Sequence, residues 1–326
     1  MHLSGRDAVE KLSLKLSNVK IGDDADISIL IITYNHADYI SSALDGVLAQ
    51  RTDKRVEVIV SEDSSTDATR TILARYVERH PQIRTLASPQ NLRSNEVVAR
   101  AIRAARGRYI CLLDGDDYWT DHDKLQRQAG MLDADPTLSA VFHNALVDDG
   151  EGVPSRRWTP ADQQMRNDVD ELWGGNPFAT CAGMMRREAL SKLGDWYADF
   201  FPITDWPLYI LCAAWGPIAF VDEPIGGYRL HPGGMFSSLP GQEKLDRIEG
   251  FYRRMRAVSP RDQQRAARGG ASRYFFEWAE VYAARGETQM ARDCLWRALR
   301  AGGASQLSAR SLLRVSRRVW GSGERR

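Results

Sequence analysis

Apolar runs and amphipathic segments alternate along the chain from residue 27 onward. Residues 27–33 (ISILIIT) are continuously apolar and rich in β-branched side chains, which is typical of a strand buried on both faces. Further strands are predicted at 56–60, 83–87 and 108–114. Helical spacing of apolar residues predicts helices at 37–50, 66–76 and 94–106. This βαβαβαβ order predicts a mostly parallel sheet covered by helices, with its strand ends along one edge.

The regular alternation fades after a fifth predicted strand at 138–147. We expect residues 148–177 to form a long loop with little secondary structure of its own. A strand–helix–strand passage is predicted over 178–230. From residue 241 onward, the spacing of apolar residues predicts helices. One helical face is expected to carry Tyr274, Phe275, Trp278, Val281 and Tyr282. The expected parts are an N-terminal extension at 1–26, an α/β domain at 27–240 and a basic helical extension at 241–326.

Composition narrows the class of protein. The four cysteines stand far apart, which disfavours a zinc knuckle or a disulfide framework and predicts buried thiols in a reducing cytoplasm. The first 26 residues carry charges throughout and contain no apolar signal core. The longest apolar stretch, 208–221, is broken by Gly216 and Pro217 and is too short to cross a bilayer. We expect a cytoplasmic protein, soluble or attached to the inner face of the membrane.

The net charge of +1 hides an asymmetry between the two ends of the chain. From residue 241 onward, 19 Lys and Arg stand against 9 Asp and Glu, so the rest of the chain is acidic. An amphipathic arrangement near the C-terminus is formed by Arg310, Leu313, Arg314, Arg317, Arg318 and Trp320. This pattern favours docking on an anionic membrane surface or a partner over nucleic-acid binding. A solvated helix face remains the alternative.

The most informative motif is Asp114-Gly115-Asp116-Asp117, which directly follows an apolar strand. Three carboxylates within four positions repel one another, and a cation would relieve that repulsion. Oxygen ligands of this kind favour Mg²⁺ or Mn²⁺, usually together with substrate phosphates. The alternative is a solvated acidic turn.

Polar clusters also follow two other predicted strands. They are Thr33-Tyr34-Asn35-His36 and the segment EDSSTD at 62–67. Either cluster alone fits ordinary turn and helix-cap chemistry. Three clusters at strand ends of one parallel sheet would meet in space, which favours a binding site.

The segments TYNHADYI, VEVIVSEDSSTDAT, NLRSNEVVARAIRAARGRYICLLDGDDYW and YRLHPGG together resemble the family 2 glycosyltransferases of GT-A fold, over residues 27–238. The resemblance implies a GT-A-type, Rossmann-like sheet. It also implies that Thr33, Tyr34 and Asn35 line the nucleoside pocket, and that Asp63 accepts a hydrogen bond from a pyrimidine base. The family's Asp-x-Asp metal motif is matched by Asp114 and Asp116, with Asp117 as a candidate substitute.

Other site residues are implied by the same resemblance. The family's Asn-x-Gly is replaced here by a segment ending in Arg93, and either Arg93 or Arg100 could reach a phosphate. His231 resembles a late histidine that contacts the metal or diphosphate, and Arg229 is a second candidate for the diphosphate. Asp205 falls where the family places its general base, with Thr replacing the preceding Glu.

The resemblance therefore implies a metal-dependent, inverting glycosyltransferase using Mn²⁺ or Mg²⁺. The expected donor is a UDP- or dTDP-sugar, and the acceptor a glycan, a lipid-linked molecule or a small molecule in surface polysaccharide or glycoconjugate assembly. A haloacid-dehalogenase-like phosphatase is the enzymatic alternative, although Tyr118 stands where that family expects Thr or Val. A non-catalytic binding protein with an arginine-rich tail is the third hypothesis. A dinucleotide dehydrogenase is disfavoured because no GxGxxG follows the first strand.

Overall fold

The computed structural model describes residues 25–150, 153–154, 156–302 and 315. Contacts divide the chain into two compact units. The first comprises the described part of Met1–Asn167 together with Pro177–Pro232, and the second comprises Asp168–Asn176 with the described part of Gly233–Arg326. The domain boundary expected at residue 240 stays a prediction.

One half of the nine-stranded sheet in the first unit is parallel. Its strands are β1 (Ile27–Thr33), β2 (Val56–Glu62), β3 (Ile83–Ala87) and β4 (Tyr109–Asp114). They lie in the order β3-β2-β1-β4, and each neighbouring pair is parallel. The predicted parallel arrangement of these four strands is confirmed.

The other half of the sheet is mixed. It is built from β8 (Gly183–Arg186), β6 (Ala140–Asp148), β9 (Ile218–Arg229), β5 (Tyr118–Trp119) and β7 (Arg166–Asn167). β8 is antiparallel to both β4 and β6, whereas β6 and β9 are parallel. β5 and β7 each pair antiparallel with β9. Short strands and a change of direction at β8 thus extend the sheet beyond its parallel half.

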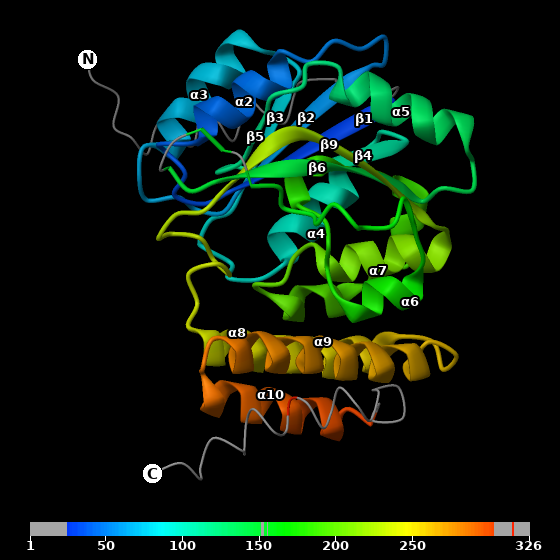
Figure 1. Cartoon of the computed structure of the whole chain (residues 1–326). Coiled ribbons are helices and arrows are strands. Elements are labelled where there is room, and N and C mark those ends of the chain that lie inside the picture. Colours follow the sequence, from blue (N-terminus) through cyan, green and yellow to red (C-terminus); the bar gives the residue numbers. More distant parts are fainter. Residues whose placement is uncertain (1–24, 151–152, 155, 303–314, 316–326) are drawn as a thin grey trace. The chain divides into compact units, whose positions relative to one another are not determined.

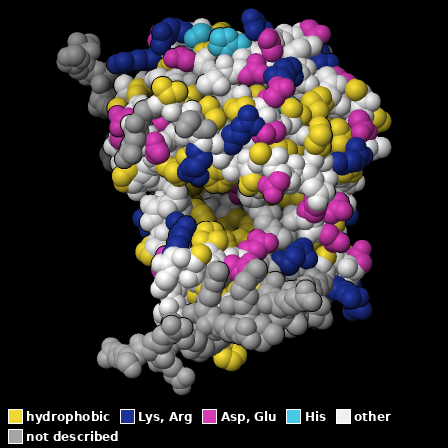
Figure 2. Space-filling view, in the orientation of Figure 1, with side chains coloured by type: hydrophobic (Ala, Val, Ile, Leu, Met, Phe, Trp, Pro, Cys, Tyr) yellow, Lys and Arg dark blue, Asp and Glu magenta, His cyan; other side chains and the backbone are white. Residues whose placement is uncertain are grey.

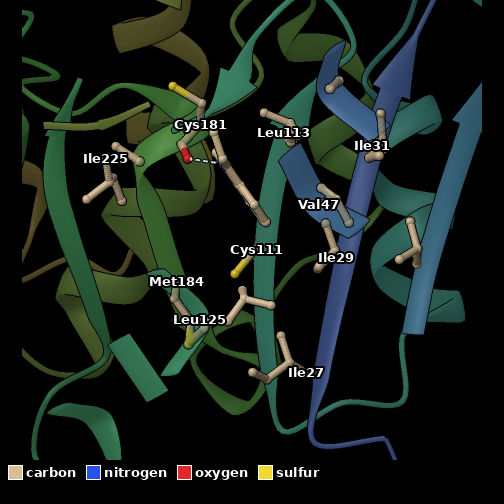
Figure 3. Close-up of a cluster of buried hydrophobic side chains, with 14 of the residues drawn as sticks. Ile27, Ile29, Ile31, Val47, Cys111, Leu113, Leu125, Cys181, Met184 and Ile225 are labelled. Atoms are coloured by element: carbon tan, nitrogen blue, oxygen red, sulfur yellow. Dashed lines mark hydrogen bonds between the residues drawn. The ribbon is translucent and has the colours of Figure 1, made fainter. Parts of the chain in front are cut away.

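Helices cover both faces of this sheet (Figure 1). On one face lie α2 (Ile40–Leu48), α3 (Thr69–Arg79) and α5 (Lys124–Ala134), and on the other lie α4 (Glu96–Ala104) and α7 (Trp206–Trp215). Three 3₁₀ helices are η1 (Thr180–Ala182), η2 (Arg187–Leu190) and η3 (Asp195–Phe200). Alternate β1 residues Ile27, Ile29 and Ile31 enter one core together with Val47 of α2 and Leu113 of β4 (Figure 3).

The expectation of a long loop without structure at 148–177 is wrong for part of that segment, which contains β7 and helix α6 (Val169–Gly174). Asp168 caps α6 because its side chain accepts hydrogen bonds from the backbone N–H groups of Asp170 and Glu171. Trp173 is fully buried in the second unit, where the Tyr252 hydroxyl donates to its carbonyl at 2.8 Å. Burial of one large aromatic side chain and a good cap stabilise a helix too short to show periodicity.

The second unit is helical, as the spacing predicted. Besides α6 it contains α8 (Gly241–Val258), α9 (Gln264–Ala284) and α10 (Thr288–Arg300). Phe275 and Tyr282 of the predicted α9 face are buried, but Val281 is 37% exposed, so its placement on that face was wrong. Helical spacing located the face, but its width depends on which neighbouring helices cover it. The C-terminal residues of the expected amphipathic arrangement lie outside the described residues.

Three observations concern the cysteines, the ability of the helices to span a membrane, and the surface charge. The cysteines Cys111, Cys181, Cys212 and Cys294 are buried free thiols. Within the described ranges, no helix combines the length and apolar character needed to cross a membrane. On the face seen in Figure 2, Lys and Arg side chains are interspersed with Asp and Glu.

Candidate functional site

The polar clusters that follow β1, β2 and β4 meet at one edge of the sheet. Thr33, the last residue of β1, is in register with Glu62, the last residue of β2. Ile32 is in register with Asp114 at the end of β4. Because these neighbouring strands are parallel, their carboxyl ends carry all three clusters to the same place.

The loops after β1 and β2 are held together by hydrogen bonds. Asn35 has a left-handed backbone (φ 54°), and its N–H donates to Ser65 Oγ at 3.0 Å. Its side-chain oxygen accepts from the Thr66 N–H at 2.7 Å. Tyr34 beside it is half-buried and Thr33 is buried. The two loops therefore form one cross-linked surface at the sheet edge.

Asp63, the expected base-binding residue, holds a neighbouring loop. Its carboxylate accepts from the Ser88 hydroxyl at 2.8 Å and from the Leu92 N–H at 3.0 and 3.1 Å. Arg93 follows with an exposed side chain and a left-handed backbone (φ 46°), the conformation that favours glycine. The backbone at residue 93 thus keeps the conformation that glycine adopts most readily, although the residue here is arginine.

The Arg100 side chain is held by hydrogen bonds at the ends of β2 and β3. Its guanidinium donates to Ser61 Oγ at 2.8 Å and to the carbonyls of Glu62 and Leu86 at 3.0 and 3.1 Å. Burial lowers the pKa of Arg100, and the nearby Asp63 and Glu62 charges oppose that effect. Three carbonyl or hydroxyl partners fix this side chain beneath the loops rather than at their surface.

Strand β9 holds the acidic motif in place. Tyr118 of β5 pairs with Gly227, which brings the end of β9 beside the motif. The Arg229 N–H then donates to Asp117 Oδ1 at 2.9 Å, and the Arg229 guanidinium donates to the Asp116 carbonyl at 2.6 Å. That guanidinium also lies over the Tyr118 and Tyr39 rings, 4.2 and 5.4 Å from their centroids. Arg229 thus fixes the backbone of the motif.

Two imidazoles face Asp116. His231 Nε2 lies 2.9 Å from Asp116 Oδ2, and His36 Nε2 lies 3.6 Å from the same oxygen. A Cβ at Gly115 would come within 2.8 Å of His36 Nδ1 and 2.9 Å of Thr33 Oγ1, so only glycine permits this approach. Sequence reasoning assigned His231 but missed His36, whose only signal was its place directly after Asn35 in the first polar cluster.

The acidic motif is electrostatically crowded. Burial raises the pKa of Asp114 well above its usual value, and the charges of Asp116 and Asp205 raise it further. Burial likewise raises the pKa of Asp117, with contributions from Asp116 and Asp114. Among the residues that the structure describes, no three His, Cys, Asp or Glu side chains already enclose a point where a metal ion would sit.

Asp205 stands at the start of α7 and close to the acidic motif. Its carboxylate accepts from the Trp206 N–H at 2.7 Å, which caps the helix, and from the Thr180 hydroxyl at 3.4 Å. Its charge contributes to the raised pKa of Asp114, so the two carboxyl groups lie within electrostatic range of each other. The structure thereby brings Asp205 from a distant part of the sequence to the edge where the strand ends meet.

Comparison with known proteins identifies the family. The model of Glycosyl transferase family 2 matches residues 28–194, which are 167 of the 326 residues. The chain belongs to this family. Family 2 membership confirms the resemblance found in the sequence and leaves the phosphatase hypothesis without support.

Relatives of this family 2 chain include an uncharacterized protein of Mycobacterium tuberculosis, 38% identical over 213 residues, which are 65% of this chain and 61% of that protein. Another is the UDP-Glc:α-D-GlcNAc-diphosphoundecaprenol β-1,3-glucosyltransferase WfaP of Escherichia coli. It is 38% identical over 95 residues, which are 28% of this chain and 36% of that protein. The chain therefore spans less than two thirds of the length of these relatives.

Solved structures show the fold. The crystal structure of S. aureus TarS 1–349 with UDP-GlcNAc matches with a TM-score of 0.57 and 16% identity, covering 86% of this chain and 91% of that one. The mannosyltransferase PcManGT from Pyrobaculum calidifontis, in complex with GDP-Man and Mn²⁺, matches with a TM-score of 0.56 and 18% identity, covering 95% of this chain and 86% of that one. The GT-A-type fold, a mixed but mostly parallel sheet flanked by helices, is confirmed.

Proposed function

We propose that this family 2 chain is a metal-dependent, inverting glycosyltransferase that moves a sugar from a nucleotide sugar to an acceptor hydroxyl in surface polysaccharide or glycoconjugate assembly. One observation carries the proposal: the crowded carboxylates of Asp114 and Asp116, an imidazole and the carboxylate of Asp205 meet at the sheet edge beside the cross-linked loops. A site for an anionic donor needs a cation at such an edge, and a general base beside it.

The donor set fits a divalent ion. Neighbouring ligand atoms of an octahedral ion, each about 2.1 Å from it, lie about 3 Å apart. The separation of 2.9 Å between His231 Nε2 and Asp116 Oδ2 matches that spacing. Asp114 is the proposed further ligand, because desolvation and the neighbouring carboxylates destabilise its charged form without a cation. Diphosphate oxygens and water would complete the shell, which suits Mn²⁺ or Mg²⁺.

A bound divalent ion would neutralise the charge that develops on the departing diphosphate. The residues of the chain supply the remaining chemistry. We assign Asp205 as the base that accepts the proton of the acceptor hydroxyl as its oxygen attacks the anomeric carbon. The bond from that carbon to the diphosphate breaks on the opposite side in the same displacement, which inverts the configuration.

The proposed donor is a UDP- or dTDP-sugar. We place its nucleoside against Thr33, Tyr34 and Asn35. A carboxylate offers about four acceptor positions, so Asp63 can still accept a base N–H besides the two donors it already holds. The complexes of TarS with UDP-GlcNAc and of PcManGT with GDP-Man and Mn²⁺ support a nucleotide sugar and a divalent ion in general. Arg93, with its exposed guanidinium, is the proposed diphosphate contact.

Calorimetry with UDP, dTDP and GDP, each with and without Mn²⁺, tests the donor and metal assignments together. We expect Mn²⁺ to strengthen UDP or dTDP binding, and Asp116→Asn to remove that enhancement while the thermal unfolding midpoint is retained. Asp53→Asn, an exposed carboxylate just before β2 and so at the opposite end of the strand, is the matched control. Unchanged Mn²⁺ dependence in Asp116→Asn would refute the metal assignment.

The base assignment is tested by Asp205→Asn. Asparagine is as good an N-cap as aspartate, so the start of α7 should stay intact. We expect donor binding to be retained and turnover to fall about 10²-fold or more, the usual contribution of a general base. Normal turnover in this variant would mean that another residue is the base.

Peripheral membrane contact is the proposed setting for a lipid-linked or glycan acceptor. The exposed α10 residues Trp296 (55%) and Leu299 (38%) stand beside Arg300, in the basic C-terminal region. Apolar and basic side chains together bind anionic bilayer surfaces. In flotation assays with phosphatidylglycerol vesicles, we expect the full chain to bind. A chain lacking residues 302–326 should bind less, because it keeps Trp296 and Leu299 but loses the basic residues that follow them. Equal binding by the full and the shortened chain would refute the proposed role of the C-terminal region in membrane contact.

A further inference from the structure

Asn95 connects two loops that are far apart in the sequence. It immediately precedes α4 and is completely buried. Its side-chain N–H donates to the Ile203 carbonyl at 2.8 Å, and its backbone N–H donates to the Ala198 carbonyl at 3.3 Å. The neighbouring Ser94 hydroxyl donates to Ala198 as well, at 3.0 Å. The residues before α4 thus hold the segment 198–203.

The use of asparagine here is not explained by helix capping. Asparagine is a favoured N-cap residue, yet the Asn95 side chain makes no capping hydrogen bond to α4. Because a carbonyl can only accept, the contact with Ile203 requires the side-chain NH₂ at that position. The Asn95 side chain therefore forms its hydrogen bond with the segment 198–203 and not with its own helix.

Both ends of this connection lead to the proposed site. The loop that precedes Asn95 is held at Ser88 and Leu92 by the carboxylate of Asp63. Ile203, at the other end, lies two residues before Asp205. A continuous path of hydrogen bonds and backbone therefore runs from the proposed nucleoside side of the site to the carboxylate that we assign as base.

We propose that Asn95 is a positioning residue that sets Asp205 relative to the bound donor. This inference rests on the proposed function of Asp205 as base. A misplacement of a catalytic group by about 1 Å can lower the rate roughly 10²-fold, so a single buried contact can matter for turnover. The amide of Asn95 touches no reacting atom and acts through the placement of the segment 198–205.

The test is a double-mutant cycle between Asn95→Asp and Asp205→Asn. Aspartate keeps the shape of asparagine but places a carboxyl oxygen against the Ile203 carbonyl, which removes the donor. UDP-glucose and UDP-GlcNAc serve as donors with water as acceptor. The water oxygen attacks the anomeric carbon, its proton passes to the base, and UDP leaves. The measurements are the kcat and KM for UDP release, and UDP binding by calorimetry.

We expect Asn95→Asp alone to lower kcat by roughly 10- to 100-fold, with KM and UDP affinity changed by no more than about twofold. In the Asp205→Asn background the same change should have no further effect, because the group being positioned is already gone. Equal losses of kcat in both backgrounds, or a loss confined to KM, would overturn the inference. If Asp205→Asn alone leaves kcat unchanged, the base assignment itself fails.

A matched control and a milder variant complete the design. Asn167 is an equally buried amide that donates to the Gln164 carbonyl at 2.8 Å, so Asn167→Asp should lower stability without changing kcat. If Asn95→Asp does not fold, Ser94→Ala replaces it in the cycle, because it removes the hydroxyl that donates to Ala198 and accepts from the Glu96 N–H but leaves the Asn95 amide in place. Ser94→Ala should then give a smaller loss of kcat that again disappears in the Asp205→Asn background, and an additive loss would contradict the proposal.

Discussion

His143 makes the stability of the first unit depend on pH. It lies in β6 with a side chain that is 1% exposed, and its Nδ1 is 3.0 Å from the side-chain nitrogen of Gln128. Burial lowers the pKa of His143 to about 4, and the charges of Lys124 and Arg127 contribute. The same Gln128 nitrogen donates to Ala182 at 2.9 Å, so it is held as a donor toward a neutral imidazole. Protonation would place two N–H groups against each other.

The magnitude follows from the difference between the folded and unfolded pKa values. Lowering the pKa of His143 from 6.5 to about 4 lowers the free energy of unfolding by about 3 kcal/mol once the pH is below both pKa values. As the pH falls below 6.5 the unfolded chain binds the proton first, and the folded chain binds it only near pH 4. The full stability of the fold is therefore present when the pH is above the pKa of His143 in the unfolded chain. It declines as the pH decreases toward the pKa of His143 in the folded chain. At about pH 5 this decline amounts to a loss of about 2 kcal/mol relative to pH 8.

Urea unfolding between pH 8 and pH 5 measures this effect. The free energy of unfolding of the unaltered protein should fall by about 2 kcal/mol more over this range than that of His143→Gln. His122→Gln, at an exposed position, should give a curve parallel to the unaltered protein. Parallel curves for the unaltered protein and His143→Gln would show that His143 gains a proton as readily in the fold as in the unfolded chain, and would refute the reasoning.

Three substitutions with local effects test the packing and the donor loop. Gly183→Ala would bring a Cβ within 2.2 Å of the buried Phe142 ring, so chemical denaturation should show a loss of about 1–3 kcal/mol. Gly130→Ala, with no atom within 4 Å of the new Cβ, should instead stabilise α5 by about 0.5–1 kcal/mol, and a loss there would contradict the geometry. Arg93→Gly should weaken UDP binding in calorimetry without lowering the unfolding midpoint, because glycine accepts the left-handed backbone. Unchanged affinity would remove Arg93 from the donor contacts.

The parallel half of the fold could be predicted from the sequence because its signals are local. The continuous apolar runs of β1 and β4 and the spacing in α2 each reflect burial of the segment itself. The mixed half could not be predicted, since β8 is four residues long and α6 is six. These short elements are stabilised by partners elsewhere in the chain.

In the candidate site, too, some residues could be predicted from the sequence and others could not. Asp114 and Asp116 carry a sequence signal, because acidic residues after an apolar strand are unusual. The approach of His36 to Asp116 and the function we assign to Asn95 depend on contacts with residues 80 and 108 positions further along the chain, and no spacing pattern encodes such contacts. Arg100 shows the converse. Its residue type suggested a phosphate contact, but its position beneath the loops gives it three partners within the protein.

The chain leaves the first unit at Asn167, contributes α6 to the second and returns at Pro177. No single cut can therefore separate the two units. A chain ended at Pro232 would retain the short α6 while losing α9, whose Gly270 approaches the Trp173 backbone so closely that a methyl group would lie 2.1 Å from the carbonyl oxygen. Such a truncation would release a large indole into water and favour aggregation, so the first unit should be expressed together with the C-terminal helices.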